Sequence, residues 1–256
     1  MFKQKNNTEF NIVGLIPARG GSKRLKNKNI MKLFGHPLMC YTLEAAKQSK
    51  LLTDFYVTTE DRKIKKTAIE YGAKVIDRPS IYSRDNSSIV GALSHAVKHI
   101  EADGKRGVDV VVWLQPNMAF REKGAIDEVI RLFFRSGASS VRTVVESRHC
   151  AQLAIFIDDK MNMRRPYISK YSKKYRKQQY KTAYYCDGSV MVFYRDNLFD
   201  PPNKQLKEFY MGKKSKVYIQ PDHYGVEIDE PVDLFMADFI HTKFPDLIKD
   251  RVKIRK

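Results

Sequence analysis

The stretch GLIPARGGSKRLKNKNI, residues 14–30, changes character abruptly after Pro17. A short apolar strand leads into a segment that holds two glycines, a serine and five basic residues. Glycine lets backbone amides approach a ligand closely, arginine can donate paired hydrogen bonds to phosphate oxygens, and lysine supplies a point charge. The segment therefore predicts a phosphate-binding loop at the end of a buried strand, with a solvated surface turn as the alternative.

The polar side chains of this loop suit a triphosphate held along its length. The candidate ligands are Arg19, Ser22, Lys23, Lys28 and Asn29. The loop is not a Walker A motif, because no lysine followed by serine or threonine stands at the required distance from the glycines. It does not contain the GxGxxG pattern of dinucleotide-binding proteins either.

Strand and helix patterns alternate from this loop as far as residue 147. Apolar runs predict strands at 11–17, 54–59, 73–79, 108–116 and 139–147, and helical periodicity predicts helices at 37–52, 61–72, 87–104 and 123–136. Such alternation is typical of crossover units in a parallel sheet with helices on both faces. We therefore predict an α/β fold, in which ligands bind at the carboxyl ends of the strands, where the loop begins.

The alternation stops after Glu146. Residues 160–186 contain no acidic side chain but nine lysines or arginines and six tyrosines. Strand patterns return at 189–194 and 215–220, and a last helix is predicted at 231–244. We predict one domain, residues 1–256, with an inserted segment at about 147–185.

Composition narrows the classes of partner. Apolar residues make up 43% of the 256 residues, which is enough for a packed core, and the net charge of +18 favours anionic partners. The sequence has no apolar run long enough for a membrane span and no apolar signal core at its start. The three cysteines have no metal-ligand spacing, so reduced thiols in the cytoplasm are the simplest interpretation.

Glu227 and Asp229 form a candidate metal site. Residues two apart on an extended strand point to the same side, and two carboxylates that face one way repel each other unless a cation lies between them. Oxygen ligands near phosphates favour Mg²⁺. In this arrangement Val226 and Ile228 face the core. The alternative is a solvated face of an edge strand.

Six motifs, in order along the chain, resemble those of the acylneuraminate cytidylyltransferases. They are IPARGGSKRLKNKNI (16–30), YVTTE (56–60), VIDRP (75–79), LQPNMAFR (114–121), DGSVMVF (187–193) and VEIDEPVDLFMAD (226–238). The resemblance implies a Rossmann-like nucleotidyltransferase fold with three layers and a mainly parallel sheet. It also implies a reaction in which the anomeric hydroxyl of a sialic-acid-like sugar acid attacks the α-phosphate of CTP and releases pyrophosphate.

The resemblance assigns roles to individual residues. Nucleotide binding falls to Arg19, Ser22, Lys23, Lys28, Asn29 and Arg78, of which Arg19 and Lys28 would act in catalysis together with Asp229. Binding of the sugar acid falls to Gln115, Arg121, Lys177, Gln178, Gln179 and Asp187. Glu227 and Asp229 would hold Mg²⁺.

Three positions depart from the family pattern, and all lie on the sugar side. Glu227 stands where the family usually has aspartate, Asp187 replaces a common asparagine, and NMAF (117–120) replaces TSPL. The sequence also lacks the Y-x-S-T-R-L type loop of the related 3-deoxy-octulosonate enzymes, which disfavours an eight-carbon acceptor. The cytidylyl transfer is therefore better supported than the identity of the sugar.

The basic, tyrosine-rich segment 160–186 supports a second function. Tyrosines interleaved with cations are what single-stranded RNA-binding proteins offer to bases and phosphates. The family instead places a dimerisation arm here, which reaches over the active site of the partner in a homodimer. We favour the arm, because a segment that closes over an anionic sugar should be cationic.

Overall fold

The computed structural model describes residues 2, 9–103, 106–149, 153–164, 176, 179–200 and 208–254. A seven-stranded sheet runs through the middle in the order β11-β7-β10-β6-β1-β4-β5. All neighbouring strands in it are parallel except β10, which is antiparallel to β6 and to β7. The strands are β1 (Ile12–Pro17), β4 (Asp54–Thr59), β5 (Lys74–Asp77), β6 (Val110–Trp113), β7 (Ser140–Glu146), β10 (Tyr184–Tyr194) and β11 (Ser215–Ile219).

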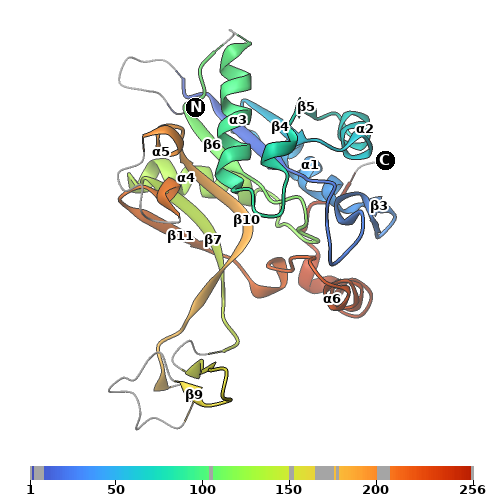
Figure 1. The fold of residues 1–256 in the computed structure, drawn as a ribbon, viewed down its shortest axis with the longest axis vertical. Helices are drawn as coiled ribbons and strands as arrows, with labels where there is room; N and C mark the ends of the chain where they lie inside the picture. The colour runs from blue at the N-terminus through green and yellow to red at the C-terminus, as the bar shows by residue number, and fades with distance from the viewer. Residues whose placement is uncertain are drawn as a thin grey trace.

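Helices cover both faces of the sheet, which gives the predicted three-layer α/β fold (Figure 1). Helices α1 (Leu38–Gln48), α2 (Arg62–Glu70) and α4 (Ala125–Ser136) pack on one face, and α3 (Ile89–Ala102) and α5 (Asp196–Phe199) on the other. Successive β1 residues face opposite layers: Ile12 and Ile16 contact the first group, Val13 and Leu15 the second. Both faces of β1 are therefore buried, as expected for an inner strand of a mainly parallel sheet.

The predicted elements agree closely with the observed ones. Strand β4 has the predicted bounds, and each predicted helix is present with shifts of a few residues at its ends. Strand β10 is longer than the predicted strand at 189–194, because its first residues pair with the end of β7 before the register shifts between Cys186 and Met191. No helix among the described residues is both long enough and apolar enough to cross a membrane.

A third apolar cluster closes one end of the molecule. It joins the start of α1, residues 119–120 and the segment before α6 (Pro231–Lys243), and it includes Val226 and Ile228. These two side chains face the core as predicted, although residues 226–229 pair with residue 118 only through an isolated bridge and are not a strand of the sheet. This packing places the carboxylates of Glu227 and Asp229 at the edge of the sheet where β1 and β6 end.

Strands β7 and β10 form a ribbon that leads out of the body (Figure 1). Beyond it lies a short hairpin of β8 (Phe156–Ile157) and β9 (Met163–Arg164). The hairpin belongs to the segment predicted as an insertion at about 147–185. Residues 165–175, 177 and 178 of the basic, tyrosine-rich part of that segment lie outside the described residues.

Candidate active site

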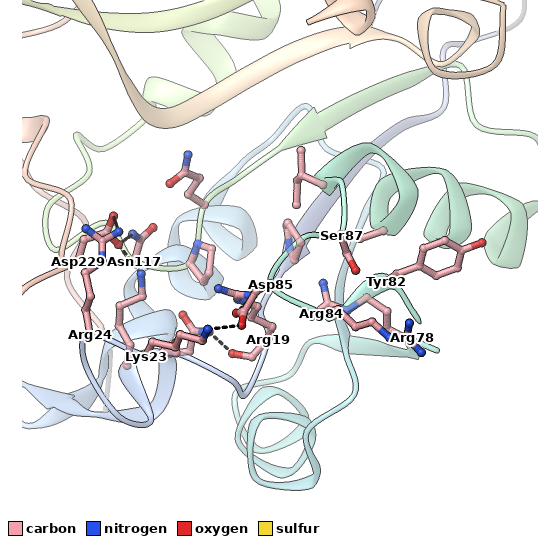
Figure 2. A pocket seen from close by; sticks show the side chains of 18 of the residues that line it. Arg19, Lys23, Arg24, Arg78, Tyr82, Arg84, Asp85, Ser87, Asn117 and Asp229 are labelled. Atoms are coloured by element: carbon pink, nitrogen blue, oxygen red, sulfur yellow. Dashed lines mark hydrogen bonds and ion pairs between the residues drawn. The ribbon is translucent and has the colours of Figure 1, made fainter. Parts of the chain in front are cut away.

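A cavity of about 560 Å³ opens where β1 and β6 end (Figure 2). Strands β4 and β5 lie on one side of β1, and β6 lies on its other side. The crevice is therefore at a topological switch point of the sheet. Nine of the predicted site residues line the cavity. They are Arg19, Ser22, Lys23, Lys28, Asn29, Arg78, Gln115, Glu227 and Asp229.

The glycine-rich loop is held in place by hydrogen bonds. Buried Asn29 donates from Nδ2 to the Arg19 carbonyl at 3.0 Å, which fixes the loop where the arginine side chain leaves it. The Gly20 amide donates to Glu60 Oε1 at 2.8 Å, and a Cβ at Gly20 would lie 2.4 Å from Asp61 Oδ2. Glycine is needed here for close packing, and its amide is directed at a protein carboxylate instead of at a ligand.

Glu60 joins three parts of the nucleotide side of the cavity. Besides the Gly20 amide, its carboxylate accepts hydrogen bonds from Arg78 Nη2 and Ser83 Oγ, both at 2.8 Å. Burial raises the pKa of Glu60, but the hydrogen bonds from Arg78, Gly20 and Ser83 outweigh it and leave the pKa below its ordinary value. The carboxylate is therefore ionised and holds the nearly buried Arg78 in place.

Asp85 reaches into the same region from the turn between η2 (Ser80–Tyr82) and α3. Its carboxylate lies 3.1 Å from Arg19 Nη1 and 2.5 Å from Lys23 Nζ, and Figure 2 shows these contacts as dashed lines. Asp85 was not expected at the site, because an aspartate in the turn SRDNSS looks like an ordinary solvated turn residue.

The carboxylate pair lies across the cavity from the turn that carries Asp85. Asn117 Nδ2 is 3.1 Å from Glu227 Oε1 and 2.9 Å from Asp229 Oδ1, so one amide bridges both. The Asp229 carboxylate also contacts Lys28 Nζ, and its backbone amide donates to Asp233 Oδ2 at 2.8 Å. Asp233 is in the first turn of α6, so the helix start orients Asp229.

The two carboxylates differ in their surroundings. Burial raises the pKa of Glu227, and the charge of nearby Asp229 raises it further, against an opposing hydrogen bond from Asn117. Burial also acts to raise the pKa of Asp229, but Lys28 and Asn117 outweigh it and the pKa is lowered. Glu227 is thus a partly buried carboxylate whose negative charge is not fully compensated.

This donor set fits Mg²⁺. Within the described ranges no group of three His, Cys, Asp or Glu side chains could enclose a metal ion. Two carboxylates on one side of a cavity still suit Mg²⁺, which keeps several waters and takes phosphate oxygens as its remaining ligands. The observation that favours a cation at this place is that Glu227 Oε1 and Asp229 Oδ1 converge on the same Asn117 Nδ2 at the wall of the cavity.

Gln115 follows β6 and lines the cavity on the side of β10. Its side chain lies against Gly188, where an added Cβ would be 2.3 Å from Gln115 Nε2. Gly188 has a φ of +69°, in the left-handed region, and is in the irregular part of β10. The missing side chain at Gly188 therefore sets the place of the Gln115 amide.

Arg121 and Asp187 were predicted to bind the sugar acid, yet both side chains are buried and neither lines the cavity. Arg121 Nη1 donates to the carbonyl and hydroxyl of Ser189, and Nη2 lies 3.3 Å from the Gln115 carbonyl. Asp187 accepts hydrogen bonds from the Thr143 hydroxyl, the Ser189 amide and Gln220. In this conformation they form a buried network behind Gln115.

Gln179 is the one predicted residue of the inserted segment that the structure describes. Lys177 and Gln178 lie outside the described residues. Gln179 is exposed, does not line the cavity, and accepts a hydrogen bond at 3.1 Å from the Arg176 amide. Several lining residues had no role in the sequence analysis: Tyr82, Arg84, Asp85, Ser87, Ser88, Trp113 and Asn117. Only Asn117 stood in a recognised motif.

A mainly parallel sheet with a cationic cavity at its switch point is typical of nucleotide-binding α/β proteins. The fold is shared with a solved CMP:2-keto-3-deoxy-manno-octonic acid synthetase complexed with CTP. The two structures superimpose with a TM-score of 0.65 at 18% identity, covering 89% of this chain and 98% of the other.

The chain belongs to the cytidylyltransferase family, whose model matches residues 13–227. It is 30% identical to an N-acylneuraminate cytidylyltransferase of Escherichia coli over 95% of this chain, but spans only 54% of that protein's length. It is 27% identical to a pseudaminic acid cytidylyltransferase of Campylobacter jejuni, over 89% of this chain and 94% of the relative. The resemblance to the acylneuraminate cytidylyltransferases is confirmed, and the match favours an enzyme over an RNA-binding protein.

Proposed function

We propose that this protein transfers the cytidylyl group of CTP to a nonulosonic acid of the sialic acid type. The observation that supports it best is the arrangement of charges in the cavity. Arg19 and Lys23 lie on one side, and Glu227 and Asp229 on the other, with Lys28 in contact with Asp229. A triphosphate needs the cations, and an acceptor hydroxyl activated near a metal ion needs the carboxylates.

The transfer is an in-line displacement at the α-phosphorus of CTP. The anomeric oxygen of the sugar acid forms a bond to this phosphorus, and the bond from phosphorus to the oxygen that bridges to the β-phosphate breaks. Pyrophosphate leaves with the electron pair, and the hydroxyl proton passes to water in the open cavity. Arg19, Lys23 and Lys28 stabilise the charge that develops on the phosphates.

The remaining residues bind and orient the substrates. Arg78, held by Glu60, faces the nucleotide, and Gln115 meets the acceptor sugar. Glu227 and Asp229 hold Mg²⁺, which when bound neutralises phosphate charge and lowers the pKa of the attacking hydroxyl. Arg121 and Asp187 then act on the acceptor through the position of Gln115, because their side chains are buried behind it.

The experiment is a pyrophosphate-release assay with Mg²⁺. The four nucleoside triphosphates are each combined with sialic, legionaminic, pseudaminic and 3-deoxy-manno-octulosonic acids. We expect release only from CTP, and faster release with a nine-carbon acid than with the eight-carbon one. Arg19→Ala should lower kcat/KM by roughly thirtyfold or more, the loss of one preorganised charged contact, without changing the melting temperature. Release from no combination would refute the proposal.

We further propose that the protein is one domain whose segment 147–185 is a dimerisation arm. The β7–β10 ribbon carries the hairpin away from the body, and the hairpin exposes the large apolar side chains of Phe156 and Met163 (Figure 1). With Ile157 and Met161 they form a group of exposed apolar side chains on one hairpin, and a contiguous apolar patch of this kind fits a protein–protein contact. Sedimentation analysis should find a dimer, and Phe156→Asp with Met163→Asp should give a monomer. A monomeric wild-type protein would refute the arm.

The cytoplasm is the proposed site of the reaction, because the cysteines have neither disulfide nor metal spacing. RNA binding through the basic segment is the second candidate function. It would appear as filter binding of single strands whose affinity falls steeply with salt. Tight binding at physiological salt together with no pyrophosphate release would favour that function instead.

A further inference from the structure

Asp85 pairs with two of the three cations that the proposed reaction assigns to phosphate. One carboxylate oxygen lies 3.1 Å from Arg19 Nη1, and the other lies 2.5 Å from Lys23 Nζ (Figure 2). A carboxylate and a phosphate accept the same kind of charge-assisted hydrogen bond from these donors. Asp85 therefore stands where a phosphate group of a bound nucleotide would make its contacts.

The turn that carries Asp85 is anchored on both sides. Ser83 Oγ donates to Glu60 at 2.8 Å, and Ser87 Oγ donates to the Ile81 carbonyl at 2.6 Å. Ser88 then caps α3 by accepting from the Val90 amide. Because these contacts hold the turn next to the loop, the carboxylate is presented to Arg19 and Lys23 at a high effective concentration.

The Asp85 side chain itself is half exposed, and the contacts found for it within the described ranges are those with Arg19 and Lys23. A hydrogen bond from Lys23 lowers the pKa of Asp85, so the carboxylate is charged near neutral pH. The anchoring of the turn depends on its serines instead of on this carboxylate. A substitution at Asp85 should therefore leave the fold intact.

On the basis of the proposed function, we propose that Asp85 is an internal anion that competes with the phosphates of CTP for Arg19 and Lys23. It pairs with the cations in the free protein, gives way when CTP binds, and returns to them as pyrophosphate leaves. A ligand that must displace such a pair binds more weakly, because its intrinsic affinity is multiplied by the fraction of protein whose cations are free. Asp85 thereby weakens nucleotide binding and speeds release of the product.

Titration calorimetry with CTP, pyrophosphate and cytidine tests this proposal, in Mg²⁺ buffer without sugar acid. Asp85→Asn should bind CTP and pyrophosphate roughly twofold to fivefold more tightly than wild type, the range expected for lost exposed ion pairs. Cytidine carries no phosphate, so its affinity should not change. Pyrophosphate should also inhibit the variant at correspondingly lower concentration. Asp85→Ala should act in the same direction.

Asp196→Asn is the matched control, because Asp196 also pairs with an arginine, Arg195 at 3.3 Å, but is exposed on α5 away from the cavity. It should bind all three probes like wild type. Equal or weaker binding of CTP by Asp85→Asn, with wild-type binding intact, would overturn the inference, and weaker binding would make Asp85 a substrate ligand. A wild-type protein that binds neither CTP nor pyrophosphate would overturn the proposed function and this inference together.

Discussion

Lys28 and Asp229 form an ion pair at the wall of the cavity although 201 positions separate them in the chain. Lys28 begins the short helix after the glycine-rich loop, and Asp229 precedes α6. The pair joins the first and the last of the motifs that resemble the family. In the protein without ligands, a cation of the proposed phosphate site and a carboxylate of the proposed metal site neutralise each other.

Asp229→Asn should reduce turnover by roughly a hundredfold or more, because it removes the charge that binds Mg²⁺ and keeps the shape of the side chain. Raising the Mg²⁺ concentration should restore only part of the activity. Initial rates across a Mg²⁺ titration measure this. Asp238→Asn, at an exposed position of α6, the helix that follows Asp229, is the control and should keep wild-type kinetics. A fully active Asp229→Asn protein would show that the carboxylates bind no catalytic metal.

Glu227→Asp should be the milder change at the same site. Aspartate keeps the charge and shortens the side chain by one methylene, which Mg²⁺ with its flexible water ligands can accommodate. We expect kcat within roughly tenfold of wild type and an unchanged midpoint of thermal unfolding. An inactive Glu227→Asp protein beside an active Asp229→Asn protein would reverse the roles argued for the pair.

Glu60 should make the protein more stable above about pH 4.5, its ordinary pKa, than below it. Its folded-state pKa is lowered, so its contribution to the free energy of unfolding is present above that value and is lost as the pH falls through the folded-state pKa. Glu60→Gln should lower the free energy of unfolding by roughly 1–3 kcal/mol at pH 7, because Arg78 loses its charged partner. It should also flatten the dependence of stability on pH.

Urea unfolding between pH 7 and pH 3 tests the role of Glu60. Glu128→Gln is the control, since Glu128 pairs with Arg131 on the exposed face of α4 and should cost less than about 1 kcal/mol. If both variants show the same pH dependence as wild type, Glu60 does not hold the nucleotide side of the cavity.

Arg121 and Asp187 should be coupled in stability. Burial lowers the pKa of Arg121 to about 10, and the charge of Asp187 acts against that shift. Removing either charge leaves the other less compensated in the core, so Arg121→Met and Asp187→Asn should each cost roughly 3–5 kcal/mol. The double variant should lose less than the sum, with a coupling of about 1–3 kcal/mol in a urea double-mutant cycle. Additive losses would contradict the network.

Gly188→Ala should raise KM for the sugar acid more than KM for CTP. The new Cβ would collide with the Gln115 amide, and the left-handed backbone disfavours alanine as well. Gly137→Ala separates these effects, because Gly137 has a φ of +57° but open space around its Cβ position. It should lower stability by roughly 1 kcal/mol and leave both KM values unchanged. Equal KM values for wild type and Gly188→Ala would show that Gln115 does not bind the acceptor.

The positions of the strands and helices and much of the cavity lining could be predicted from the sequence. Apolar periodicity is local, so it locates β4 or α3 without knowledge of the partners. The motifs identified Arg19, Lys28 and Asp229 as candidates, and the structure shows that Lys28 and Asp229 are in contact. The amide of Gly20 was predicted to face a ligand, and the structure directs it to Glu60 instead.

Other features depended on the tertiary structure alone. Nothing in the neighbourhood of Asp85 or Glu60 in the sequence indicates that they contact the loop. The burial of Arg121 and Asp187 was not expected from two polar residues in motifs on the sugar side. The physical reason is that secondary structure follows from side-chain patterns over a few residues, whereas charge pairing and burial depend on which strands become neighbours. The order of the sheet decides that, and with it which carboxylate meets which cation.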